Sequence, residues 1–230
     1  MSFFGRHLYW FSRNSVLLAA KLLWKISYID TANIPKTGPL IIASNHASHL
    51  DPPLIGAGVP RKVTFIAKQE LFSVPFVGWW MKQIGQISVA RGGGGKEALA
   101  TAEEVLRNDG CIIIFPEGTR TKSGRMQRGR TGVAVLALRT GAPVIPAAVE
   151  GTFEAFGHGK KIPKPGRVTV QFGKPLTFGQ HIAADGTYPR AALEEVTSQI
   201  MLEIQRMLPE KRRPAEGEVP PAQTLSGNTG

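Results

Sequence analysis

A histidine and an aspartate lie at a spacing that suits proton transfer. His46 and Asp51 have four residues between them in the segment SNHASHLD, Ser44 to Asp51. If the chain turns back here, the carboxylate can hold one ring N–H and fix the tautomer of the imidazole. The other ring nitrogen is then free to take a proton from a hydroxyl group. The pair therefore indicates general-base chemistry, although a turn histidine beside a helix-capping aspartate would give the same local pattern.

A second segment combines a carboxylate with arginines. Phe115 to Arg120 reads FPEGTR, and a cationic, glycine-rich run that includes Arg130 follows it. Arginine can bind two phosphate oxygens at once, a geometry that lysine does not match. Gly118 gives the turn a backbone freedom that other residues lack. Arg120 and Arg130 are therefore candidates for binding an anionic group. A solvated loop is the simpler interpretation for the other cations of the run, which are Lys122, Arg125 and Arg128.

Arg91 is a third candidate for binding phosphate. It follows a strand-like alternating segment, 85–90, and precedes four glycines and Lys96. The glycine run does not form a phosphate loop of the Walker type, because Glu97 stands where a serine or threonine must follow the lysine. We interpret the run as a flexible connection into a helix, with Arg91 as a phosphate ligand at its start.

Two other chemistries fit the sequence less well. His46, His49 and Asp51 could bind a metal ion, but the remaining histidines and the single cysteine, Cys111, form no second cluster with ligand spacing. A serine hydrolase would need a G-x-S-x-G elbow, which the chain lacks. We therefore expect neither a metal ion nor another cofactor.

The two reactive segments each follow a short apolar run that is typical of a buried strand, at 39–44 and 110–115. In α/β proteins reactive groups lie in such turns at the ends of strands. Further strands are predicted at 63–67, 144–149 and 168–172, and helices at 96–107, 131–139 and 191–208. This alternation predicts an α/β fold with a mostly parallel central sheet flanked by helices.

The first 32 residues differ from the rest of the chain. They contain four cations and no acidic residue before Asp30, interleaved with aromatic and aliphatic residues. On a helix the cations gather on one side and Phe4, Phe11 and Leu18 on the other, which is typical of a helix or helix pair lying in a membrane interface. A basic helix packed on its own domain is the alternative. The longest apolar stretch, Ser15 to Ala20, is far shorter than the about 18 residues of a spanning helix.

Composition is consistent with this division of the chain. The formal charge of +11 implies an anionic partner, such as a phospholipid headgroup, a phosphorylated substrate or a nucleic acid. Residues 33–208 form the predicted catalytic domain, and residues 209–230, poor in bulky apolar side chains, are expected to be disordered. The aromatic segment Leu71 to Met81 could line an acyl-chain tunnel, contact a membrane or pack in the core.

Four segments together resemble a known family. The order His-x-x-x-x-Asp, Gly-x-x-x-x-x-Arg, FPEGTR and Val144-Ile145-Pro146 is similar to the four blocks of the glycerolipid acyltransferases, above all the 1-acyl-glycerol-3-phosphate acyltransferases. The likeness covers roughly residues 33 to 178. The resemblance implies that His46 is the general base and Asp51 orients it. It places the acceptor's glycerol phosphate at a site whose matching residues are Arg91, Glu117, Gly118, Thr119, Arg120 and Arg130.

Two positions depart from the family pattern. The second block usually has an aromatic residue and an isoleucine before its arginine, whereas this chain has Ser88-Val89-Ala90. A lysine often follows the third block where Arg130 is the best match here. These differences leave the base unchanged and bear on how the acceptor is held.

The resemblance implies transfer of a fatty acyl group from acyl-CoA or acyl-carrier protein to the sn-2 hydroxyl of 1-acyl-glycerol 3-phosphate, giving phosphatidic acid. The expected partners are the acyl donor, lysophosphatidic acid and a membrane phospholipid surface, without nucleic acid. Peripheral or monotopic attachment to the cytoplasmic face of a bacterial inner membrane is expected. Glycerol 3-phosphate or another lysolipid is an alternative acceptor, and a non-catalytic anionic-lipid-binding module is an alternative function. The oxyanion would be stabilised by backbone amides after His46 or near Gly118.

Overall fold

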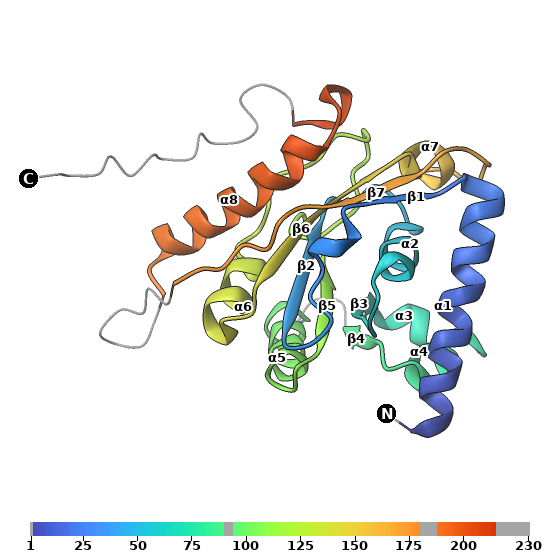
Figure 1. The fold of residues 1–230 in the computed structure, drawn as a ribbon, viewed down its shortest axis with the longest axis horizontal. Helices are drawn as coiled ribbons and strands as arrows, with labels where there is room; N and C mark the ends of the chain where they lie inside the picture. The colour runs from blue at the N-terminus through green and yellow to red at the C-terminus, as the bar shows by residue number, and fades with distance from the viewer. Residues whose placement is uncertain (1, 90–93, 180–187, 215–230) are drawn as a thin grey trace, which may run out of the picture.

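The computed structural model describes residues 2–89, 94–179 and 188–214 (Figure 1). Its strands are β1 (Ser27–Ile29), β2 (Leu40–Ser44), β3 (Thr64–Lys68), β4 (Ile87–Val89), β5 (Cys111–Ile114), β6 (Val144–Glu150) and β7 (Thr169–Phe172). Its α-helices are α1 (Phe3–Trp24), α2 (Asp51–Gly58), α3 (Gln69–Phe72), α4 (Val77–Gln83), α5 (Gly94–Arg107), α6 (Gly132–Thr140), α7 (Thr152–Phe156) and α8 (Arg190–Met207). Two 3-10 helices are η1 (Thr31–Asn33) and η2 (Glu210–Arg212).

The strands form one sheet of seven in the order β1-β7-β6-β2-β5-β3-β4. The strands β6, β2, β5, β3 and β4 run parallel to one another, whereas β7 pairs with β6 in the antiparallel direction and β1 pairs with β7 in parallel. The predicted α/β fold with a mostly parallel central sheet is thus confirmed. Because β2 and β5 are adjacent and parallel, the segments that follow them leave the same edge of the sheet.

Helices cover both faces of the sheet (Figure 1). Successive side chains of a strand point to opposite faces, and in β2 Ile41 and Ala43 pack with α5, α6 and α8, while Leu40 and Ile42 pack with α1 and α2. All five residues of β2 are buried. The apolar run at 39–44 is therefore a central strand buried on both faces, which explains why it shows no alternation of polar and apolar residues.

The N-terminal segment packs against the rest of the fold. The helix α1 is one continuous helix, and its residues Tyr9, Ala20 and Trp24 are buried against the domain. The strand β1 then joins the sheet beside β7. Residues before the predicted boundary at residue 32 therefore contribute buried side chains and a strand to the fold. The strand β1 was not predicted, because a strand of three residues leaves almost no pattern in the sequence.

The predicted disordered tail starts too early. Residues 210–212 form η2, and Arg212 is only 8% exposed. Residues 215–230 lie outside the described residues. The fold therefore continues past α8 for at least one ordered turn.

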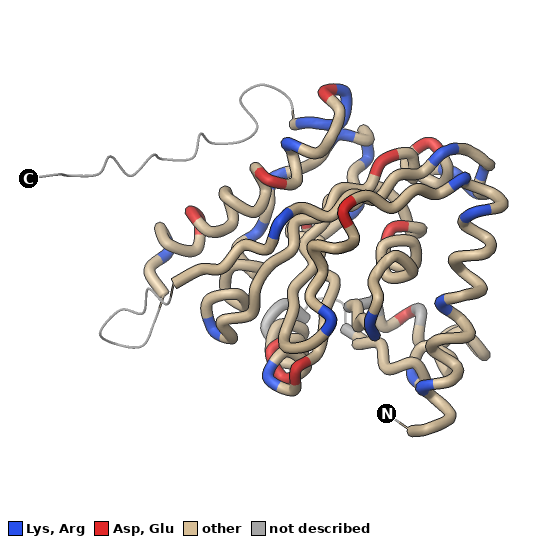
Figure 2. Tube along the Cα trace, in the orientation of Figure 1, with Lys and Arg blue, Asp and Glu red and all other residues tan. Residues whose placement is uncertain are grey.

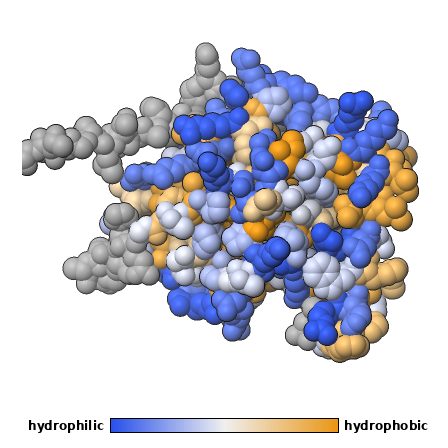
Figure 3. Space-filling model, in the orientation of Figure 1, coloured by the Kyte–Doolittle hydropathy of each residue, from blue (hydrophilic) through white to orange (hydrophobic). Residues whose placement is uncertain are grey.

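Apolar side chains of α1 also face solvent. Figure 3 shows hydrophobic residues along the side of the molecule formed by α1. We call this surface the apolar face of α1; its exposed members are Phe3, Phe4, Trp10, Phe11, Leu18, Leu22 and Leu23. Val74, Phe76 and Trp79 are exposed next to its N-terminal half, where the Trp79 ring lies 6.4 Å from that of Phe4. Among the helices described, none is both long and apolar enough to cross a bilayer.

Candidate active site

His46 and Asp51 meet in the turn between β2 and α2. Nδ1 of His46 lies 2.9 Å from Oδ2 of Asp51, and the histidine side chain is 17% exposed whereas the aspartate is fully buried. The tautomer that this contact favours has the proton on Nδ1, which then donates to the carboxylate. Nε2 is left as an acceptor at the partly open side of the ring. A histidine held in this way can act as a general base toward a hydroxyl group.

The carboxylate of Asp51 is itself held in place. Besides the imidazole, Oδ2 accepts hydrogen bonds from the backbone amides of Ala47 at 2.6 Å and Ser48 at 2.7 Å. The helix α2 begins at Asp51, and its N-cap residue Leu50 makes no capping hydrogen bond with its side chain. Oγ of Ser48 accepts the backbone amide of Leu50 at 3.1 Å, so Ser48 and Asp51 both bind free amides at the start of the helix. Oδ2 thus accepts three donors, whereas Oδ1 of Asp51 is buried and has no hydrogen-bond partner among the described residues.

Neighbouring residues that sequence reasoning missed fix the turn. The amide side chain of Asn45 forms two hydrogen bonds with the backbone of Val149 in β6, at 2.9 and 2.8 Å. The hydroxyl of Ser48 donates to the carbonyl of Phe156 at 2.7 Å. The His46 ring stacks on Phe115 with 4.0 Å between centroids and 19° between planes. Only the tertiary fold brings these partners together, so their sequence positions gave no signal.

Glu117 ties the two reactive segments together. Its Oε1 accepts the backbone N–H of His46 at 2.8 Å, and its Oε2 accepts the backbone N–H and the side-chain amide of Gln127 at 3.0 and 3.2 Å. In return, the amide of Thr121 donates to the carbonyl of His46 at 2.8 Å. Both oxygens of Glu117 therefore contact protein, and in this structure the residue fixes the position of the histidine backbone.

The cations of the third block surround a hollow beside this turn. Gly118 has φ +72°, and its Cα approaches the side chain of Arg130 so closely that a Cβ would lie 3.0 Å from Nε. Arg120 is partly buried and Arg130 is exposed, and within the described residues neither side chain forms an ion pair or hydrogen bond. Thr119 is exposed at the same turn. The hollow is lined by Thr119, Arg120, Thr121, Lys122, Arg125 and Gln127.

Arg91 lies outside the described residues. The amides of Ala47 and Ser48 donate to Asp51, and the amide of Gly118 donates to the carbonyl of Phe115 at 2.9 Å. These three amides are therefore occupied and do not serve as the expected oxyanion donors in this conformation.

Comparison with known proteins gives the family. The model of the acyltransferase family matches residues 25–150, which is more than half of the chain and includes both reactive segments. The chain belongs to the acyltransferase family. A crystal structure of the 1-acyl-sn-glycerophosphate acyltransferase of Thermotoga maritima superimposes with a TM-score of 0.68 at 26% identity, covering 88% of this acyltransferase and 77% of that chain.

Curated relatives carry related names. The 1-acyl-sn-glycerol-3-phosphate acyltransferase of Bacillus subtilis is 27% identical over 203 residues, which are 87% of this chain and 98% of the relative. A chloroplastic enzyme of that name from Arabidopsis thaliana is 32% identical over 66% of this chain, which spans 44% of that longer protein. The lyso-ornithine lipid O-acyltransferase of Pseudomonas aeruginosa is 33% identical over 48% of this acyltransferase and 43% of the relative.

Burial raises the pKa of Glu117 to about 7 from its ordinary value of 4.5. The hydrogen bonds from His46 and Gln127 oppose the shift, and the charge of Asp51 adds to it. An unfolded chain releases this proton near pH 4.5, whereas the folded acyltransferase keeps it until about pH 7. Between these values the native state binds more protons, so its free energy of unfolding falls as the pH rises.

Glu117 is therefore expected to lower stability by about 3 kcal/mol between pH 4.5 and about pH 7. Thermal unfolding followed by circular dichroism over this range should show a falling melting temperature. Replacing Glu117 by glutamine removes the titrating group and should remove most of the slope. An equally steep slope in the variant would assign the titration to another group.

The C-terminal turn holds the cationic loop in place. Nε of Arg212 donates to Glu150 at 2.9 Å, and its Nη2 contacts the carboxylate of Glu154. The carbonyl of Arg212 accepts the amide of Met126 from the loop at 2.7 Å. The guanidinium also lies 5.4 Å from the ring centroid of Phe153. Arg212 therefore connects the end of the chain, the loop after the third block and α7.

Replacing Arg212 by methionine is expected to lower stability by about 1–3 kcal/mol, because Glu150 loses a charged donor in a half-buried position. The loop should also be held less firmly, so the KM for the acceptor should rise more than the KM for the acyl donor. The single ammonium group of a lysine at this position cannot reproduce the two-nitrogen contact of the guanidinium with both glutamates. Arg212→Lys should therefore recover only part of the stability that Arg212→Met loses. Equal changes of both KM values would contradict a role in positioning the loop.

Proposed function

We propose that this acyltransferase transfers a fatty acyl group to the sn-2 hydroxyl of 1-acyl-glycerol 3-phosphate, giving phosphatidic acid for phospholipid biosynthesis. The observation that carries the proposal is the contact of 2.9 Å between His46 Nδ1 and a fully buried Asp51 carboxylate. The segment that holds the backbone of His46 also carries Arg120 and Arg130, whose side chains have no ion-pair partner among the described residues. The names of the relatives from Bacillus subtilis and Thermotoga maritima support the same reaction.

In the proposed mechanism, Nε2 of His46 takes the proton of the acceptor hydroxyl as its oxygen attacks the thioester carbonyl. Asp51 holds the imidazole in the required tautomer and stabilises the imidazolium that forms. The carbon–sulfur bond then breaks, and the proton passes from His46 to the leaving thiolate. No acyl-enzyme intermediate is needed, because the acceptor hydroxyl is the nucleophile.

Charge favours a phosphate-bearing acceptor. Arg120 and Arg130 lie at the turn whose Glu117 holds the backbone of His46, so a phosphate bound there would stand near the base. Guanidinium groups bind phosphate oxygens in pairs. Arg91 remains a further proposed ligand, and Gly118 and Thr119 would supply the backbone of the phosphate site. An acceptor without phosphate would leave these cations without a counter-charge.

Membrane association and the acyl donor belong to the same proposal. The apolar face of α1, with Phe76 and Trp79, would lie in the interface of the inner membrane on its cytoplasmic side. Acyl-CoA or acyl-carrier protein would supply the thioester. An apolar cavity between α1, α2 and α4, lined by Val16, Pro53, Ala57, Val63, Phe65 and Trp80, is small but apolar enough for the end of an acyl chain.

A panel of acceptors tests the proposal. The protein in neutral detergent micelles would receive radiolabelled long-chain acyl-CoA or acyl-carrier protein with lysophosphatidic acid, glycerol 3-phosphate, or lyso-ornithine lipid. We expect lysophosphatidic acid to be the only acceptor that gives product, or to react at least tenfold faster than the other acceptors. A chelator should not change the rate. Preference for the ornithine lipid, which the Pseudomonas aeruginosa relative suggests as second candidate, would overturn the assigned acceptor. No transfer with any pair would favour the non-catalytic lipid-binding module.

A further inference from the structure

A basic loop lies against the C-terminal end of α1. Residues 157–167, GHGKKIPKPGR, follow α7, and we call them the basic loop. The amide of Gly166 donates to the carbonyl of Leu23 at 3.1 Å, and the indole N–H of Trp24 donates to the carbonyl of Lys164 at 2.9 Å. The backbone of the loop is therefore fixed on α1, and the two segments form one surface (Figure 1).

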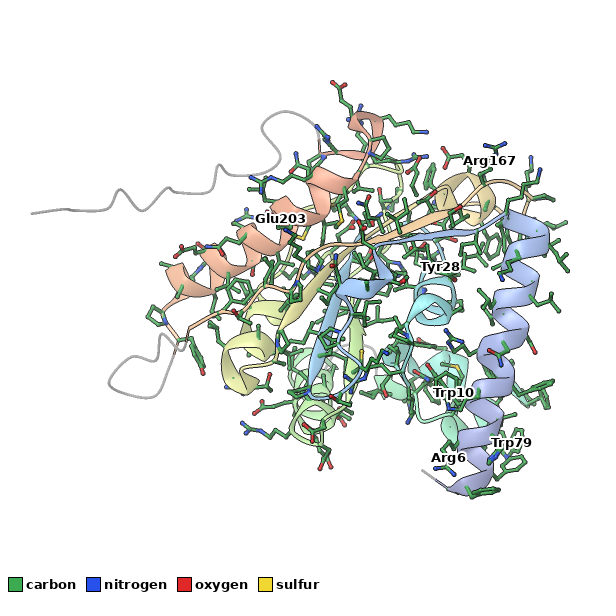
Figure 4. The ribbon with its side chains drawn as sticks, viewed as in Figure 1. Arg6, Trp10, Tyr28, Trp79, Arg167 and Glu203 are labelled. Atoms are coloured by element: carbon green, nitrogen blue, oxygen red, sulfur yellow. The ribbon has the colours of Figure 1, made fainter. Side chains whose placement is uncertain are left out.

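Unpaired cations gather on this surface. Figure 2 shows Lys and Arg on the end of α1 and on the neighbouring loop, and Figure 4 shows Arg167 pointing outward there. Besides Lys160, whose ammonium donates to the carbonyls of Phe153 and Glu154, this surface carries five cations, which are Lys21, Lys25, Lys161, Lys164 and Arg167. All five are exposed, and across the described ranges none forms an ion pair. The nearby carboxylate of Glu154 is paired with Lys211 and Arg212.

Exposed aliphatic side chains lie among these cations. Ile162, in the middle of the basic loop, is 76% exposed, and Leu22 of α1 is 72% exposed. Leu22 belongs to the apolar face of α1, so the cationic surface continues that face at its C-terminal end. A surface that is both cationic and aliphatic matches the boundary between lipid headgroups and acyl chains.

The basic loop starts at the rim of the active site. Phe156, the last residue of α7, accepts the hydrogen bond from Ser48, which lies in the turn between His46 and Asp51. The loop begins with the next residue, Gly157. Whatever binds the loop is therefore held close to the catalytic turn.

We propose that the basic loop and the C-terminal end of α1 bind the phosphate-bearing headgroups of anionic phospholipids, with Ile162 and Leu22 inserted among the acyl chains. The inference rests on the membrane association in the proposed function and adds a second contact, with charge selectivity, outside residues 1–32. An acidic carrier protein would suit the cations, but the exposed aliphatic residues and their continuity with the apolar face of α1 favour a lipid surface.

Vesicle binding tests this proposal with the full chain. Co-sedimentation would compare vesicles of phosphatidylcholine alone with vesicles that contain about one third phosphatidylglycerol. One variant carries Lys161→Gln, Lys164→Gln and Arg167→Gln. The matched control removes the same charge from α6 and α8, across the sheet from α1, by Arg139→Gln, Arg190→Gln and Arg206→Gln. Circular dichroism melts would check that both variants fold.

We expect the wild type and the control to bind the anionic vesicles at least tenfold more tightly than the neutral ones. Each Lys or Arg near an anionic surface contributes about a fivefold gain in binding, so the loop variant should lose at least tenfold, and salt should weaken the remaining difference. Ile162→Ser should weaken binding to both kinds of vesicle. Transfer to lysophosphatidic acid in neutral micelles should stay unchanged in the loop variant.

Unchanged vesicle binding by the loop variant, or an equal loss in the control, would overturn the proposal. Normal vesicle binding with a selective loss of transfer from acyl-carrier protein would instead identify the loop as a docking site for the carrier. A failure of the proposed function would show separately, as absent transfer by the wild type in micelles. Lipid binding does not depend on that result.

Discussion

Replacing His46 by alanine is expected to lower kcat by about two to four orders of magnitude, which is the usual contribution of a general base. The fold should survive, because the imidazole is partly exposed and its main protein contacts are Asp51 and the ring of Phe115. The amides of Ala47 and Ser48 still hold the carboxylate of Asp51 in the variant. Single-turnover measurements in micelles with lysophosphatidic acid and acyl-CoA would separate the chemical step from binding.

His49→Ala is the matched control for this experiment. His49 lies in the same turn, three residues further on, and its ring is 6.2 Å from that of Phe156. The general-base proposal expects this variant to keep most of its activity, whereas a metal site made of His46, His49 and Asp51 would lose its activity in both variants. Retained turnover in His46→Ala would remove the histidine from the mechanism.

Replacing Asp51 by asparagine is expected to reduce kcat by a similar two to four orders of magnitude. An amide presents one acceptor and one donor, whereas Asp51 Oδ2 now accepts the imidazole N–H and two backbone amides. Either the amide nitrogen replaces Oδ2, so that the imidazole adopts the wrong tautomer and the backbone amides lose their acceptor, or it replaces Oδ1, which has no hydrogen-bond partner among the described residues, and its donors are left unpaired. Either loss is buried, so stability should also fall by about 1–3 kcal/mol.

The double variant His46→Ala with Asp51→Asn gives the sharper test. If the two residues act as one unit, the double variant should be hardly slower than His46→Ala alone, because the aspartate works only through the histidine. Multiplied losses would show that Asp51 contributes to turnover by a separate route. Melting temperatures would correct each rate for the fraction of folded protein.

Central elements could be predicted from the sequence because their patterns are long or fully apolar. The run 39–44 gave β2, and the helix predicted at 191–208 is α8, Arg190–Met207. The contact between His46 and Asp51 was expected if the chain turned back between them, and the structure shows that turn. In these three cases, the residues that determine the structure lie close together in the chain.

The remaining features depend on residues far apart in the sequence. The hydrogen bond of Glu117 with the backbone of His46, 71 positions away, was not predicted. Arg212 was assigned to a disordered tail, because the residues next to it in the sequence do not indicate its ion pair with Glu150, which lies 62 residues earlier. The helix α7 has only five residues and was not predicted. Short elements and long-range polar contacts are set by the assembled sheet.

The way α1 is built into the domain affects how the protein can be handled. Tyr9 accepts the amide N–H of Val63 at 2.9 Å, and Trp24 holds the basic loop through Lys164. Deleting the helix to obtain a water-soluble enzyme would therefore uncover Val63 and β1 and release the loop next to the catalytic turn. Polar replacements at Phe3, Phe11 and Leu18, whose side chains face outward, are the better route to a detergent-free preparation.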